Sequence, residues 1–160
     1  MIGRFGSFLV VSCCLIAASQ HATAQQSAIL PQVKALHLRV STPPANVPKS
    51  CSTYSGVFGG QFADGPYANL VIMTVAAGPN GCVFHGIYGW SAYAKDPNPG
   101  TVDVGPGSRL ESKMVNGSLK LGDPAQAALV VHPDLHADFY MQGKLISHAA
   151  LKRLPPAALQ

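Results

Sequence analysis

A two-residue turn constrains the fold of this 160-residue chain more than any other feature. Asn116 and Gly117 join two short runs that are rich in β-forming residues. Asn-Gly is the strongest short signal for a β-hairpin, because both central positions of a type I′ turn require positive φ. Gln142-Gly143 predicts another tight turn, and a cluster of glycine, proline and asparagine at 77–81 predicts a third. A chain with these turns folds back on itself as antiparallel hairpins.

The spacing of turns and apolar runs predicts the fold class. Runs of β-forming residues recur at short intervals, separated by Gly, Pro, Asn and Asp, which is typical of β-meanders, sandwiches and barrels. We therefore predict an all-β fold, an antiparallel meander that forms a small barrel or sandwich of about eight strands. This domain is predicted at 51–154, with a tail at 155–160. The predicted strands are 55–62, 69–76, 82–93, 108–115, 118–121, 127–132, 137–141 and 144–152.

The pattern within each run predicts which faces are covered. Charged and apolar side chains alternate over 109–114, as in a sheet with one face in water. Residues 69–76 are nearly all apolar, so this strand is predicted to be covered on both faces, by the protein itself or by a ligand or partner. Gly86 and Gly89 predict a bulge, a bend or a close backbone approach. The longest irregular stretch, 94–107, is either a binding loop or a flexible tip.

The N-terminal residues have the pattern of a secretory signal peptide. Arg4 precedes an apolar run at 5–18, and Ala22-Thr23-Ala24 forms an A-x-A cleavage site. The pattern predicts a signal peptide at 1–24, cleavage after Ala24, and a periplasmic or secreted protein without a transmembrane segment. Lipid attachment at Cys13 is the alternative. Residues 25–50 are predicted to form an extended proline-rich leader, in which 33–40 is the candidate for an edge strand.

Two cysteines remain after removal of the signal peptide, Cys51 and Cys82. Disulfides persist in exported proteins, so we predict that the two are paired. The entropy of closing this loop gives a stabilisation of about 3–4 kcal/mol. Two free, buried thiols are the alternative, and the spacing fits neither a redox C-x-x-C motif nor a zinc site.

Four segments of the chain resemble a small exported bacterial β-domain. They are Tyr54-Ser55-Gly56-Val57-Phe58-Gly59-Gly60, Leu70-Val71-Ile72, Cys82-Val83-Phe84-His85-Gly86-Ile87-Tyr88-Gly89-Trp90, and the stretch from Gly143-Lys144-Leu145 to Leu151-Lys152-Arg153. Domains of this kind occur alone or attached to secreted hydrolases. The resemblance covers about 51–153. It implies a lipocalin-like or avidin-like small β-barrel without known catalysis, and it assigns no functional residue.

Charge and composition exclude one class of partner. The formal net charge of the chain is +4, and removal of Arg4 with the signal peptide lowers it from +4 to +3. The basic residues are scattered along the sequence, without a run and without interleaved aromatic residues. The sequence therefore predicts no nucleic-acid partner.

Two classes of function remain ahead of an enzyme. A binding module would hold a small apolar or sugar-like ligand on an aromatic face at the barrel mouth. The alternative is a structural or interaction domain that binds another envelope protein or a hydrolase through the same surface. An enzyme comes third, because Ser91 lacks the second glycine of a nucleophile elbow, although a Ser-His-Asp triad requires no closeness in sequence. No cofactor is predicted, and the predicted ligand-binding residues are Phe58, Tyr67, Tyr88, Trp90 and Tyr93.

The segment 132–136 has two readings. In an extended chain His132, Asp134 and His136 project to one face, and this donor set suits zinc, copper or nickel. Pro-Asp is also an ordinary turn signal, in which Asp134 bonds to local backbone and the histidines flank a hairpin in water. We favour the turn and predict no metal site. His85 and His148 are predicted to be partly buried strand residues.

Overall fold

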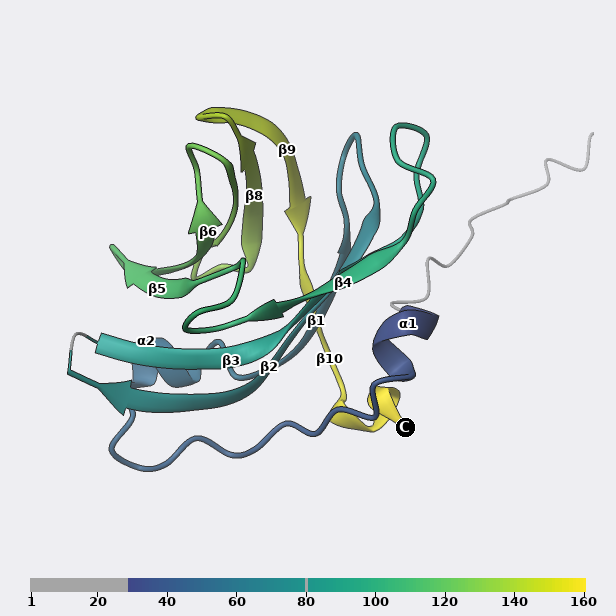
Figure 1. Ribbon diagram of the computed structural model, residues 1–160. Helices are drawn as coiled ribbons and strands as arrows, with labels where there is room; N and C mark the ends of the chain where they lie inside the picture. Colours follow the sequence, from purple (N-terminus) through teal and green to yellow (C-terminus); the bar gives the residue numbers. More distant parts are fainter. Residues whose placement is uncertain (1–28, 80) are drawn as a thin grey trace, which may run out of the picture.

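Two five-stranded antiparallel sheets form the protein (Figure 1). The computed structural model describes residues 29–79 and 81–160, so the predicted signal peptide, its cleavage site and Cys13 lie outside the described residues. The strand order is β10-β1-β2-β3-β4 in the first sheet and β5-β6-β7-β8-β9 in the second. The predicted all-β antiparallel fold is confirmed. The strands are β1 (Gly56–Gln61), β2 (Tyr67–Gly78), β3 (Gly81–Trp90), β4 (Gly100–Val104), β5 (Ser112–Val115), β6 (Ser118–Asp123), β7 (Ala127–Val131), β8 (His136–Met141), β9 (Lys144–Ala150) and β10 (Lys152–Leu154).

The predicted two-residue turns have the required backbone. Asn116 and Gly117 have φ angles of 50° and 80°, and they connect β5 to β6 with Val115 opposite Ser118. Gln142 and Gly143 have φ angles of 51° and 76° between β8 and β9. Both hairpins are confirmed, and they fix the register of the second sheet.

The main core lies between the two sheets. Phe58, Leu70 and Phe84 come from the first sheet, and Leu119 and Leu129 come from the second; each is at most 2 % exposed. The chain crosses between the sheets at Leu151, which separates β9 from β10. Figure 1 shows this crossing as the yellow segment that runs from β9 down to β10.

A second, smaller core covers the other face of the first sheet. Val57 and Val71 pack there with Val33, Leu154 and Leu159, all at most 5 % exposed. The prediction that the apolar strand at 69–76 is covered on both faces is confirmed. The cover is supplied by the protein itself, from the leader and the C-terminal segment, where a short 3₁₀ helix η1 spans Pro156–Leu159.

The structure corrects the prediction for the leader. Residues at 33–40 do not form an edge strand; instead α1 (Pro31–Lys34) is a short helix, and a second helix α2 covers Lys49–Ser52. Pro31 stands in the first turn of α1, where a missing N–H costs nothing. Val33 of this helix is fully buried, and Val47 also belongs to the main core. The leader is therefore part of the folded structure.

Two further differences concern strand number. The described residues hold ten strands, because β4 lies within the stretch predicted to be irregular and the predicted last strand is divided at Leu151. The predicted strand at 108–115 begins only at Ser112. Gly86 and Gly89 mark a bulge and a close approach, as predicted. Gly86 lies opposite Ile72, where the register of β2 shifts before Thr74, and a Cβ at Gly89 would collide with Val33.

A disulfide joins Cys51 in α2 to Cys82 in β3, with Cα atoms 6.3 Å apart. The predicted pairing is confirmed. Among the described residues, no helix has both the length and the apolar character that crossing a membrane requires.

Candidate functional site

The predicted aromatic face is divided by the fold. Phe58 is 1 % exposed and belongs to the main core, with the Arg153 guanidinium 4.7 Å from its ring centroid. Tyr67 projects to the opposite face of the first sheet, because its neighbour Ala68 faces the main core. Tyr93 lies in the turn after β3, where it pairs with Asp96. Phe58 is thus a core residue, and the five aromatic residues do not form one surface.

The structure does bring Tyr88 and Trp90 together. Their rings stack with centroids 6.0 Å apart, and the Trp90 Nε1 donates a hydrogen bond to the Asn98 carbonyl. Gly100 lies against the indole ring, since a Cβ there would collide with it. Burial raises the pKa of the Tyr88 phenol, and the nearby Tyr93 adds to the effect. Both side chains are half-buried, and the pair is packed and hydrogen-bonded within the protein.

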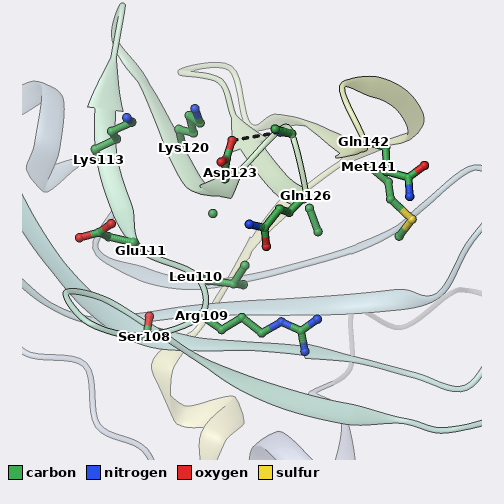
Figure 2. Close-up of a pocket in the computed structure, with 13 residues that line it drawn as sticks. Ser108, Arg109, Leu110, Glu111, Lys113, Lys120, Asp123, Gln126, Met141 and Gln142 are labelled. Atoms are coloured by element: carbon green, nitrogen blue, oxygen red, sulfur yellow. Dashed lines mark hydrogen bonds between the residues drawn. The ribbon is translucent and has the colours of Figure 1, made fainter.

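An open groove of about 790 Å³ lies at one end of the second sheet (Figure 2). The connection between β4 and β5, the β5–β6 hairpin, the β6–β7 turn and the β8–β9 turn converge there. Its volume is in the range of small-molecule sites. The lining side chains that bear charge or hydrogen-bonding groups are Ser108, Arg109, Glu111, Lys113, Lys120, Asp123, Gln126 and Gln142.

Three cations of the groove have no anionic partner. Lys113 and Lys120 are directly opposite each other on β5 and β6, and Figure 2 shows them on neighbouring strands with Arg109 on the connection below. Within the described residues none of the three forms an ion pair. Like charges directly opposite in a sheet cost about 0.2–1 kcal/mol. This arrangement leaves positive charge free for an anionic ligand.

The backbone around the groove is held by hydrogen bonds. Gln142 N donates to the Gln126 carbonyl at 3.0 Å, and Gly143 N donates to the Pro124 carbonyl at 2.7 Å, so the β6–β7 and β8–β9 turns are joined. Gly122 N donates to the Glu111 carbonyl at 2.8 Å, which fixes the β5 side. A wall that is already ordered loses less conformational entropy when a ligand binds.

Sequence reasoning missed this groove, although a signal was available. The basic residues are scattered in sequence, but a two-residue turn at Asn116-Gly117 makes positions equidistant from it face each other. Counting outward from that turn places Lys113 opposite Lys120, as the structure has it.

The histidine segment folds as the predicted turn. Asp134 Oδ1 accepts a hydrogen bond from His136 N at 3.0 Å, so Asp134 belongs to the turn and not to a donor set with the imidazoles. Asp138 takes the place expected of Asp134: its two oxygens lie 3.1 Å from His132 Nε2 and 3.0 Å from His136 Nε2. The structure describes no group of three or more His, Cys, Asp or Glu side chains in 29–79 and 81–160 that could hold a metal ion.

His148 supplies a third imidazole beside His132 and His136. We define the histidine cluster as these three residues and Asp138. The His136 ring stacks on His148 at 5.7 Å and lies 5.9 Å from the His132 ring. His148 is exposed, as is His85, so the expectation that both are partly buried is wrong. The reason is that each side chain points away from the core face of its strand.

Ser118, His132 and Asp138 form a hydrogen-bonded series with the composition of a catalytic triad. Ser118 Oγ lies 3.1 Å from His132 Nδ1, whose other nitrogen faces Asp138. Two features argue against nucleophilic catalysis there. Ser118 is only 8 % exposed, and β6 is paired on both edges, which commits its backbone N–H groups to the sheet instead of an oxyanion hole. Ser91, the other serine considered, has its Oγ bonded to Tyr67 N at 3.0 Å.

Side chains of both sheets pack together in the main core, whereas the groove and the histidine cluster lie on the outer surface. There the groove presents unpaired cations and amides, and the histidine cluster presents titratable rings. Comparison of the chain with models of protein families, with characterised proteins and with solved structures found no match.

Proposed function

We propose that this protein is a non-catalytic binding module that holds an acidic, sugar-like ligand in the groove. The observation that carries the proposal is the convergence of Arg109, Lys113 and Lys120, all without ion-pair partners in the described structure, on one open groove of about 790 Å³. Arginine and lysine bind carboxylate, sulfate and phosphate groups through charge-assisted hydrogen bonds.

The remaining lining supports a polyhydroxyl ligand. Gln126 and Gln142 each offer an amide donor and acceptor, and Glu111 offers a carboxylate, which are the groups that bind hydroxyls. Leu110 and Met141 add apolar surface for the face of a sugar ring. The groove is open, which suits a chain passing through it better than a small apolar molecule that needs enclosure.

The proposed place of action is the periplasm or the extracellular space. The Cys51–Cys82 disulfide supports this, because such bonds persist in oxidising compartments. The N-terminal signal pattern points the same way.

Binding of oligogalacturonate and of dextran sulfate, measured by calorimetry at low salt with neutral dextran as a comparison, tests the proposal. We expect both acidic polymers to bind and dextran not to bind. Lys113→Gln combined with Lys120→Gln should weaken binding about tenfold, since two charge contacts of about 0.7 kcal/mol each amount to that factor. Lys49→Gln combined with Lys152→Gln removes the same charge outside the groove and should change affinity less than about twofold. Equal binding of dextran, or equal effects of the two double variants, would contradict the proposal.

A specific feature favours the interaction domain as a second candidate. Leu145 and Ile146, next to each other in β9, are 54 % and 47 % exposed. A bulge between Phe139 and Tyr140 of β8 shifts the pairing with β9 at this point. Exposed apolar side chains of this kind mark protein contacts. Sedimentation analysis of the wild type and of Ile146→Ser distinguishes the candidates: self-association lost in the variant, without binding of acidic polymers, favours the interaction domain.

A further inference from the structure

We infer that the anion-binding surface extends from the groove across the outer face of the second sheet to the histidine cluster, and that it takes an extended anionic polymer more tightly in acid. This inference rests on the proposed function of the groove. It names the kind of partner, an extended acidic polysaccharide, and the condition under which this partner binds best.

The sheet register places the two sites on one face. Lys113 is opposite Lys120, Lys120 opposite Val130, Val130 opposite Asp138, and Asp138 opposite His148. Residues directly opposite in an antiparallel sheet project to the same side. These residues therefore form one row across all five strands, from the groove to the histidine cluster. With strands about 4.8 Å apart, the row is about 19 Å long, which exceeds a single sugar unit.

The geometry of the histidine cluster accommodates protonated rings. Both nitrogens of His132 face an oxygen, Ser118 Oγ at one end and Asp138 Oδ2 at the other. His136 Nε2 faces the second oxygen of the same carboxylate. The His132 and His136 side chains are 36 % and 43 % exposed, so water and a ligand reach them. A doubly protonated imidazole would thus have acceptors for its N–H groups.

Protonation reverses the charge of this half of the row. With neutral imidazoles, Asp138 makes the histidine cluster negative, and it repels an anionic chain that is held at Lys113 and Lys120. Histidine side chains gain a positive charge as pH falls through the range of about 8 to 5. With all three rings protonated, their positive charges outweigh the single carboxylate of Asp138, and the row is cationic along its length.

Other charged groups near this face do not cancel the effect. They are Glu111 on the connection into β5, Asp123 at the end of β6, Asp134 in the β7–β8 turn, Lys144 at the start of β9 and Asp64 in the β1–β2 loop, where Asp64 N donates a hydrogen bond to Ser147 Oγ. These groups are the same in the wild type and in the histidine variants. A difference in pH dependence between the two proteins therefore comes from the imidazoles.

The test uses dextran sulfate, whose sulfate esters keep their charge in this range, at pH 7.5 and 5.5 and fixed ionic strength. The wild type is expected to bind about tenfold or more tightly at pH 5.5, from the added charges on the row. His132→Gln with His136→Gln and His148→Gln should reduce this ratio to about twofold or less. His37→Asn with His85→Gln removes two exposed histidines outside the row and should leave the ratio unchanged.

Each outcome decides between the two proposals. One outcome is binding at pH 7.5 that needs Lys113 and Lys120, with a ratio of affinities at the two pH values that the histidine variant does not change. This outcome supports the groove as the binding site and refutes the extension to the histidine cluster. Binding only at pH 5.5 that needs the histidines refutes the groove as the main site and supports the histidine part. No binding at either pH refutes both. If the triple variant fails to fold, His148→Gln, which removes an exposed ring stacked on His136, should lower the pH ratio about two- to threefold; an unchanged ratio refutes the extension.

Discussion

The packing of Val33 on Gly89 gives the sharpest test of whether the leader belongs to the fold. A Cβ placed on Gly89 would collide with Val33 Cγ2, and its next neighbour, Thr101 Cγ2, would be 3.4 Å away. Val33 is fully buried in the second core. A methyl group at position 89 therefore fits only if Val33 shifts, either by its side chain or together with α1.

The magnitudes follow from this geometry. Gly89→Ala is expected to lower the free energy of unfolding by about 1–2 kcal/mol, because overpacking costs about 1–3 kcal/mol and the lower entropy of the unfolded chain offsets part of it. Val33→Ala removes two buried methyl groups, about 1.6 kcal/mol of transfer free energy, and with the cavity term the cost is about 2–3 kcal/mol. In the double variant the new methyl group occupies the space that Val33 vacates. Its destabilisation should fall short of the sum of the single effects by about 1–2 kcal/mol.

Urea unfolding of the oxidised protein measures all three variants, with Leu36→Ala as a control. Leu36 is 44 % exposed, so its truncation should cost less than about 0.5 kcal/mol. A Val33→Ala variant as stable as the wild type, or a double variant whose cost is the plain sum, would show that α1 does not pack on the sheet.

Three further predictions concern stability. Gly117→Val should cost about 1–3 kcal/mol in urea unfolding, because φ at this position is +80° and a β-branched residue resists it, whereas Gly78→Ala should cost less than about 1 kcal/mol; equal midpoints would contradict a tight turn at Asn116-Gly117. Cys51→Ser with Cys82→Ser removes a disulfide with a sequence separation of 31 and should lower the free energy of unfolding by about 3–4 kcal/mol. An unchanged urea midpoint after reduction of the wild type would contradict this prediction. Lys113→Gln with Lys120→Gln should raise the stability of the ligand-free protein by about 0.2–1 kcal/mol at low salt, and the gain should shrink at 1 M salt; a loss of stability would contradict repulsion between the two lysines.

The fold was largely predictable because its determinants are local. A two-residue turn and a period-2 pattern each act over a few residues, so the β5–β6 and β8–β9 hairpins could be placed from the sequence. Strand β4 and helix α1 were missed because they depend on distant parts of the chain. Gly100–Val104 becomes a strand by pairing with β3, and α1 becomes ordered by packing Val33 at Gly89.

The candidate site was less predictable, because it depends on which side each residue faces. Tyr67 and Phe58 were grouped by residue type, yet they project to opposite faces of the first sheet. Asp134 was grouped with the histidines by closeness in sequence, whereas Asp138 is the carboxylate that contacts them, two residues beyond His136 on the same face of β8. Residue type finds candidates, but register decides which of them meet.

The row of charges on the second sheet is difficult to explain by folding alone. Placing Lys113 opposite Lys120 destabilises the hairpin, and no ion pair in the described structure compensates for it. A core needs neither lysine, since the buried faces of β5 and β6 are formed by other residues, among them Leu119 and Leu121. An arrangement that costs stability and leaves charge unpaired is typical of a binding surface. If the double glutamine variant is more stable and also binds acidic polymers about tenfold more weakly, the same two residues account for both the loss of stability and the binding.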